Sequence, residues 1–236
     1  MDIKPLTFLP VIEGIKDRSF GGVRPKPATC SSCPMAQEGS GFCPDWKGKG
    51  PIKLAFLLEA PGPNEILYHK PLVGKAGLLW EYAFLKPLGL SRDEVIIANT
   101  IRCFPGYDKK TQDIKYPIGY TRDVAERTCR QYDGRHGEDG ELVHGGIEQW
   151  NPNLFYLTYH PAAVLRTRAY FFLVKKNVQR AFEFSRMGYR VCIVMGGKGA
   201  ALVMPHIEGS GGLDTWNGHW FEGEWRTRKE KGFKQI

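Results

Sequence analysis

The sequence predicts an α/β protein with a parallel sheet that helices cover on both faces. Four short apolar segments, at about residues 52–58, 95–101, 153–159 and 189–195, have the length and composition of buried strands. Helical patterns lie between them, which is typical of parallel strands joined by crossovers. Ligands of such sheets bind beyond the carboxyl ends of the strands, so we look for function there.

The composition is that of a folded, basic protein. The 236 residues are 42% hydrophobic, enough for one sizeable core, and the mean hydropathy of −0.35 and the lack of long apolar runs exclude a membrane span. The net charge is +8, with basic clusters at residues 166–190 and 226–234, which favours nucleic acid, although charge alone fits a merely soluble basic protein equally well. The first twenty residues lack the apolar core of a secretory signal, so we expect a cytoplasmic protein. We also expect it to be a monomer.

We predict a single domain over residues 1–236. Residues 1–50 have the composition of a basic arm followed by a cysteine-rich loop. Residues 106–120 and 133–151 are charged or rich in glycine and show no period, so we expect surface insertions there.

The first strand leads into the stretch on which the functional interpretation depends. An acidic loop punctuated by Pro and Gly follows it and contains Glu59 and Glu65. Residues 76–90 then show a helical pattern, which should end near Pro87 and Gly89. Its apolar spacing is carried by Leu78, Leu79, Tyr82, Leu85 and Leu88.

The later elements repeat this arrangement. A helical segment is expected around residues 121–132 and another over 170–187, where basic and apolar faces separate. Polar residues follow each strand: Glu59 and Glu65 after the first, Asn99 near the end of the second, and His160 after the third. This convergence predicts a site at the carboxyl edge. Glycines 196, 197 and 199 after the fourth strand either cradle a phosphate or form a plain turn.

Cysteines at close spacing indicate a metal or a cluster. Cys30 and Cys33 form a C-x-x-C pair and Cys43 follows, in a compartment where disulfides are not expected. Thiolates of this kind suit zinc or an iron-sulfur cluster, and Cys43 could be a ligand in either. Cys192 lies inside an apolar strand and is expected in the core.

Four ordered blocks resemble the motifs of the iron-sulfur uracil-DNA glycosylases known as family 4. The blocks are residues 59–77, residues 98–105, the set Glu126, Cys129 and Tyr132, and residues 160–166. The resemblance covers most of residues 30–225. It implies the three-layer α/β/α fold of that family, with a central four-stranded parallel sheet, and an enzyme that flips a base out of DNA and hydrolyses its N-glycosidic bond.

The resemblance also implies roles for individual residues. The catalytic set is Glu65, which positions water or stabilises the sugar cation, with Glu59 and His160. The residues implied to bind the base are Ala60, Gly62, Leu72 and Asn99. The residues implied to contact DNA are Lys75, Arg166, Arg168 and the wedge Leu165. The implied ligands of a [4Fe-4S] cluster are Cys30, Cys33, Cys103 and Cys129, with zinc as the alternative metal.

The chain departs from the family pattern in three places. The last two strand-helix units are exchanged in order, which makes the strand connections uncertain. Leu72 replaces the phenylalanine that stacks on the base, and Ile66 stands where a second carboxylate is frequent, followed by the bulky pair Tyr68 and His69. Leu72 is either a neutral replacement or the mark of a larger substrate.

These observations leave several functions open. The substrate is uracil or a bulky modified pyrimidine of the kind found in phage DNA, with a role in base repair or in antiviral defence. The first alternative is a cluster-containing protein that binds or covalently traps DNA without turnover. The second is a small zinc-dependent nucleic-acid protein.

Overall fold

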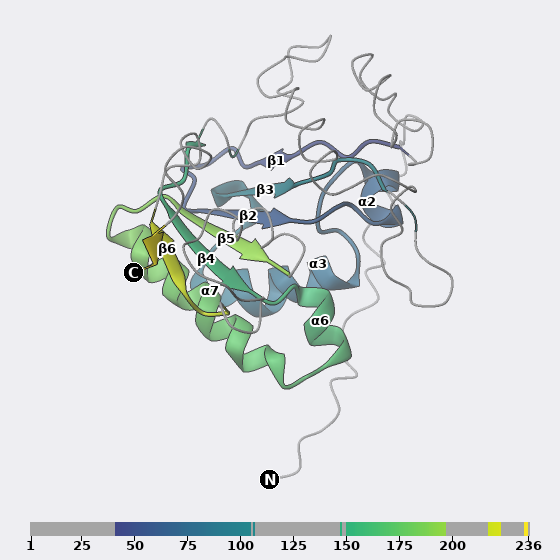
Figure 1. The fold of residues 1–236 in the computed structure, drawn as a ribbon. Helices are drawn as coiled ribbons and strands as arrows, with labels where there is room; N and C mark the ends of the chain where they lie inside the picture. Colours follow the sequence, from purple (N-terminus) through teal and green to yellow (C-terminus); the bar gives the residue numbers. More distant parts are fainter. Residues whose placement is uncertain are drawn as a thin grey trace.

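The computed structural model describes residues 41–104, 106, 147, 150–196, 217–222 and 234–235, which form one seven-stranded sheet (Figure 1). The strands are β1 (Trp46–Lys47), β2 (Leu54–Leu58), β3 (Val95–Asn99), β4 (Leu154–Thr158), β5 (Val191–Met195), β6 (Trp220–Glu222) and β7 (Lys234–Gln235). Their order across the sheet is β1-β3-β2-β5-β4-β6-β7.

The four central strands are parallel, as predicted. β2 pairs with β3 and β5, and β4 pairs with β5, all in parallel register. Every residue of these four strands is buried, which explains their continuous apolar sequences. The α/β class is thus confirmed. The short antiparallel strands β1, β6 and β7 at the two edges were not predicted.

The two units whose order is exchanged in the sequence both enter this parallel sheet. β5 follows β4 in the chain but lies between β2 and β4 in space. The permutation of the connections relative to the family stays a prediction.

The segment between β2 and β3 contains more helix than the sequence indicates. The helices here are α2 (Pro63–Tyr68), α3 (Lys75–Leu79), the π-helix η2 (Trp80–Leu85), and the 3-10 helices η3 (Lys86–Leu88) and η4 (Arg92–Glu94). The predicted acidic loop is therefore partly helical, because Pro63 can occupy the first turn of a helix. The predicted helix does stop at Gly89, whose φ of 71° only glycine adopts easily.

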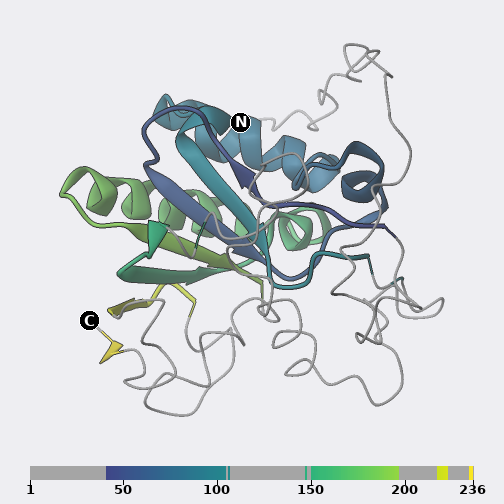
Figure 2. The ribbon, with the colours of Figure 1, turned by 90° about the horizontal axis from the view of Figure 1, so that it is seen from above.

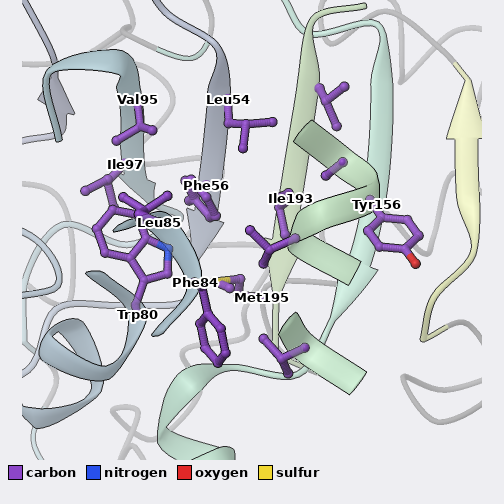
Figure 3. Close-up of a cluster of buried hydrophobic side chains, with 14 of the residues drawn as sticks. Leu54, Phe56, Trp80, Phe84, Leu85, Val95, Ile97, Tyr156, Ile193 and Met195 are labelled. Atoms are coloured by element: carbon purple, nitrogen blue, oxygen red, sulfur yellow. The ribbon is translucent and has the colours of Figure 1, made fainter. Parts of the chain in front are cut away.

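The helical run from α3 to η3 buries the predicted apolar positions only in part. Leu85 is buried and Leu79 and Leu88 pack against the larger core, as the spacing indicates. Trp80 and Phe84 are buried as well, whereas Tyr82 is 45% exposed. The π-helical turn is the reason, because five residues between bonded groups shift the inward face relative to a regular helix. Figure 3 shows Trp80 and Phe84 directed at the strands, and Trp80 meets Phe56 edge-on at 5.0 Å.

The larger core lies on one face of the sheet. After β4 the chain forms α6 (Pro161–Arg166) and α7 (Tyr170–Arg186), and α7 packs on the same face as η2. Figure 2 shows these two helical segments, in blue and green, on the same side of the sheet. None of the helices in the described residues has the length and apolar character needed to cross a bilayer.

The opposite face carries a smaller core. Ile147 is fully buried against it and Trp150 packs beside it, so the end of the predicted insertion 133–151 contacts the sheet rather than the solvent. The rest of the predicted third layer lies outside the described residues. The same holds for the basic arm, the helix around 121–132 and glycines 197 and 199.

A buried polar network connects α7 to β4. Asn177 is 2% exposed, and its amide accepts a hydrogen bond from Tyr156 Oη at 2.8 Å and donates to Thr158 Oγ1 at 2.9 Å. It also donates to Asn217 Oδ1 at 3.4 Å. Every buried polar atom of this side chain therefore has a partner, as interior amides require.

Candidate active site

The carboxyl ends of the four parallel strands form one edge, to which hydrogen bonds attach the following loops. Thr100 donates through Oγ1 to the Glu59 carbonyl at 2.6 Å, which joins the exits of β2 and β3. The Gly196 amide donates to the Thr158 carbonyl at 2.8 Å, which joins the exits of β5 and β4. The strand order therefore places Asn99, Glu59, Gly196 and His160 along this edge, as the sequence predicts.

Asn99 is the last residue of β3, and its side chain points to the face covered by α3 and α7. This follows from alternation, because Val95 and Ile97 belong to the core on that face. Asn99 is 3% exposed, and within the described part of the chain its Nδ2 has no hydrogen-bond partner. A buried donor without a hydrogen bond costs about 1–3 kcal/mol. Asn99 therefore lowers the stability of the folded state.

His160 caps the N-terminus of α6. Its Nδ1 accepts the Ala162 amide at 3.1 Å, which fixes the tautomer with the proton on Nε2. Burial, with a smaller repulsion from Arg166, lowers the pKa of His160 from 6.5 to about 4. At neutral pH the ring is thus an uncharged donor. Gly196 lies against it, since a Cβ there would be 3.3 Å from His160 Cβ.

Glu65 holds the loop between α2 and α3 by its amides. Oε1 accepts the Val73 and Gly74 N–H groups, and Oε2 accepts the Gly62 N–H group, all at 3.1 Å. Three of the roughly four lone-pair directions of the carboxylate are therefore used by backbone. Its predicted partner in catalysis, Glu59, lies one residue beyond β2, where the bond from Thr100 fixes its main chain.

Arg92 holds the same loop by its carbonyls. Its guanidinium donates to the Pro71 carbonyl at 3.0 Å and to the Leu72 carbonyl, and Nε pairs with Glu81 at 3.0 Å. Burial lowers the pKa of Arg92 and the paired Glu81 opposes that shift. The loop is thus clamped by an anion on two amides and a cation on two carbonyls.

The clamped loop sets the position of Leu72. This residue has a φ of 51°, in the left-handed region, which costs a non-glycine residue about 1–2 kcal/mol. Its side chain is 5% exposed and packs in the larger core. Gly77 permits this arrangement, because a Cβ there would overlap the Leu72 carbonyl. Leu72 offers little free surface in this state, and its role against a base stays a prediction.

The remaining predicted base-binding residues belong to the same loop. Ala60 is partly buried, and Gly62 is the N-cap of α2, extended and bonded to Glu65. Ile66, which stands where a carboxylate is frequent in the family, lies on the buried side of α2. His69 ends α2 with a φ of 47° and contacts the Phe42 carbonyl through Nδ1 at 3.3 Å.

The predicted DNA contacts are at the surface. Lys75 is exposed in the first turn of α3, and α3 packs against α6. Leu165 is 44% exposed, and Arg166 and Arg168 after it are exposed too. An exposed leucine followed by two cations is what a wedge into DNA requires.

Cys43 and Cys103 lie in two segments that hydrogen bonds join. Cys103 is buried just after β3, and the preceding Arg102 pairs with Asp45 through two bonds, at 2.8 and 3.2 Å. The Cys43 amide donates to the Arg102 carbonyl at 2.8 Å. The end of the cysteine-rich loop, at Cys43 and Asp45, is therefore hydrogen-bonded to the residue that precedes Cys103.

The other predicted ligands, Cys30, Cys33 and Cys129, lie outside the described residues. Cys43 is fully buried, and burial raises the pKa of its thiol. Its participation in the cluster stays a prediction. Cys192 lies in the core, as expected.

Sequence reasoning missed Arg92 and Trp80. The partners of Arg92 are eleven to twenty-one residues away in the chain, so no local pattern reveals the contact. The only signal is a capped turn, in which Ser91 and Glu94 bond reciprocally and place Arg92 at the start of η4.

Comparison with known proteins supports the predicted family. No family model matches the chain. It is 31% identical over 159 residues to the type-4 uracil-DNA glycosylase of Saccharolobus solfataricus, a match that covers 58% of this chain and 72% of that protein. It is 29% identical over 164 residues to the type-4 uracil-DNA glycosylase of Pyrobaculum aerophilum, covering 59% and 81%. The chain therefore belongs to the type-4 uracil-DNA glycosylase family.

Proposed function

We propose that this chain is a monofunctional DNA glycosylase that flips uracil out of DNA and hydrolyses its N-glycosidic bond, leaving an abasic site. Two findings support the proposal: the family, whose members above are named uracil-DNA glycosylases, and Asn99. The single observation that carries it is the buried Nδ2 of Asn99 at a strand exit, for which the described residues supply no hydrogen-bond partner. A fold retains such a group when a ligand satisfies it.

Asn99 and His160 would bind the flipped base. The amide of Asn99 has a donor and an acceptor, which match the carbonyl and N–H of a uracil edge. The neutral His160 ring would donate its Nε2 proton toward O2, where negative charge develops as the base leaves. The ring is already neutral at physiological pH, so it needs no change of protonation state before it forms this hydrogen bond.

The two carboxylates would divide the remaining work. Glu59 is the group we assign to the sugar, where it would stabilise the cation or orient the attacking water. Glu65 would act mainly as a positioning residue, because three backbone amides already hold its oxygens. Leu165 would fill the gap left by the flipped nucleotide, and Lys75, Arg166 and Arg168 would contact phosphates.

We further propose that Cys30, Cys33, Cys103 and Cys129 hold a [4Fe-4S] cluster. Four thiolates are the usual ligands of such a cluster, and the bonds between residues 43–45 and Arg102 support the assembly of the two segments. When bound, the cluster would supply a structural cross-link. A broad visible absorbance band in anaerobically purified protein, with iron rather than zinc on metal analysis, would distinguish the two metals.

The test is release of the base. The protein is incubated with oligonucleotides that contain uracil or a bulky 5-substituted pyrimidine, abasic sites are cleaved with alkali, and the free base is identified by mass spectrometry. We expect uracil release, and its loss in Glu59→Gln with an unchanged melting temperature. Absence of any released base refutes turnover, and a protein–DNA adduct that survives denaturing electrophoresis then indicates trapping. Release of only the 5-substituted base would instead establish the modified pyrimidine as substrate.

A further inference from the structure

Phe172, near the start of α7, is the most exposed large hydrophobic side chain in the described residues, at 78%. A phenylalanine ring in solvent forgoes the favourable free energy of burying its apolar surface. Its position is nevertheless fixed. Phe171 meets it edge-on at 5.4 Å, and Phe171 in turn packs at 5.7 Å on the buried Phe84. Phe172 is therefore supported by the core through Phe171 while most of its surface stays exposed to solvent.

The start of α7 is also attached to the carboxyl edge of the sheet. Tyr170 stacks on Tyr159 at 4.1 Å, and Tyr159 precedes the N-cap His160. The turn between α6 and α7 is hydrogen-bonded, from Tyr170 N to the Thr167 carbonyl at 3.1 Å. Phe172, in the first turn of α7, thus follows the exposed Leu165 across the short connection between α6 and α7. The two helices meet at a corner in Figure 1.

The surroundings of Phe172 are cationic. Lys175 and Lys176, three and four residues further along α7, share its exposed helix face. Arg166 and Arg168 are exposed in the preceding turn. The nearest exposed acid on α7 is Glu183, three helical turns away. A partner that offers a flat apolar face next to repeated negative charge fits this surface, and an unpaired base in DNA has both.

We propose that Phe172 stacks on an unpaired base of the DNA, next to the nucleotide displaced by Leu165, while Lys175 and Lys176 contact the adjoining phosphates. The inference rests on the proposed function for the identity of the partner. It extends the DNA-binding surface beyond α6 onto α7. It also supplies an aromatic plate for a base other than the one being excised.

The test compares exposed hydrophobic residues at the two ends of α7. Phe172→Ala, Phe172→Trp and the control Met187→Ala are titrated with a fluorescent single-stranded oligonucleotide at one fixed salt concentration. Met187 is 72% exposed just after the end of α7, so the control removes a similar apolar surface far from the site. A second oligonucleotide carries 2-aminopurine, whose fluorescence is quenched by stacking.

We expect Phe172→Ala to raise Kd at least about fivefold, because base–aromatic stacking contributes about 1–3 kcal/mol. It should also abolish the 2-aminopurine quenching, whereas Phe172→Trp should retain both. Unchanged affinity of Phe172→Ala, or equal weakening in Met187→Ala, overturns the proposal. A change in oligomeric state of Phe172→Ala without loss of DNA affinity also overturns it and identifies a protein contact.

Excision is measured on the same wild-type sample to separate the two claims. If wild type releases no base but its DNA affinity depends on Phe172, the proposed function fails and the stacking contact stands. If wild type releases base and Phe172→Ala binds DNA normally, the stacking contact alone fails. Lack of DNA binding by wild type overturns both.

Discussion

Replacing Asn99 with alanine should remove activity without removing stability. No residue in the described part of the chain bonds the Nδ2 of Asn99. Such a donor costs the folded state about 1–3 kcal/mol, and its removal offsets the packing lost with a small side chain. We therefore expect the free energy of unfolding to change by about 1 kcal/mol or less in either direction. A lost hydrogen bond to a base that acquires charge corresponds to about 1.5–3 kcal/mol, so kcat/KM for uracil release should fall about 10- to 150-fold.

Asn177→Ala is the matched control. The two residues have the same side chain and nearly the same exposure, 3% for Asn99 and 2% for Asn177, but only Asn177 is fully bonded. Its removal leaves the hydroxyls of Tyr156 and Thr158 without their partner, so we expect a loss of about 2–5 kcal/mol. Urea unfolding and single-turnover excision measure both variants.

If Asn99→Ala loses as much stability as Asn177→Ala, Asn99 is not a residue whose hydrogen bond forms only with the substrate. That outcome would mean that the amide of Asn99 is a structural group satisfied within the protein. Wild-type excision by Asn99→Ala would equally refute its role in binding the base.

Three further predictions follow from the loop and from His160. Glu65→Gln should lower the free energy of unfolding by about 1–3 kcal/mol, because an amide cannot accept all three N–H groups. Urea unfolding measures this loss, and full stability with lost excision would instead show that Glu65 acts directly in catalysis. Because the pKa of His160 is lowered from 6.5 to about 4, the unfolded chain binds the proton first on acidification. Wild type should therefore lose stability between about pH 6.5 and pH 4, and His160→Gln should be flatter in melts across that window; parallel curves would contradict this. Gly77→Ala should lower both the melting temperature and excision, because its Cβ would overlap the Leu72 carbonyl, whereas Gly89→Ala, with open space but a φ of 71°, should cost only about 1 kcal/mol; equal effects would argue against a tight loop.

The strands and their polar exits could be predicted because both signals are local. A buried parallel strand is a short run of β-branched residues, and the rule that ligands meet the carboxyl ends places Asn99 and His160 without any coordinates. The family motifs gave the same residues independently. Each of the four observed strands is two residues shorter than its predicted segment, since the apolar sequence pattern continues into the flanking residues.

The contacts that shape the loop could not be predicted in this way. Arg92 lies in an ordinary capped turn, and its bonds to the carbonyls of Pro71 and Leu72 depend on how η4 lies against the loop between α2 and α3. The π-helical turn at Trp80 likewise has no sequence signature. The regular helical spacing therefore placed Tyr82 on the apolar face, although Tyr82 is exposed. Tertiary packing decides both features.

Some polar groups of the site are fully hydrogen-bonded within the described residues and others are not. This difference predicts how the stability and the activity of variants will correlate. In the loop, Glu65 and Arg92 satisfy the backbone, so variants that free those groups should lose stability and activity together. At Asn99 the donor has no partner among the residues that the structure describes, so a variant that removes it should lose activity alone. Such a division is expected where a rigid support holds a group whose hydrogen bond forms only with the substrate. A positive correlation across all of these variants, Asn99 included, would show that the whole site is structural.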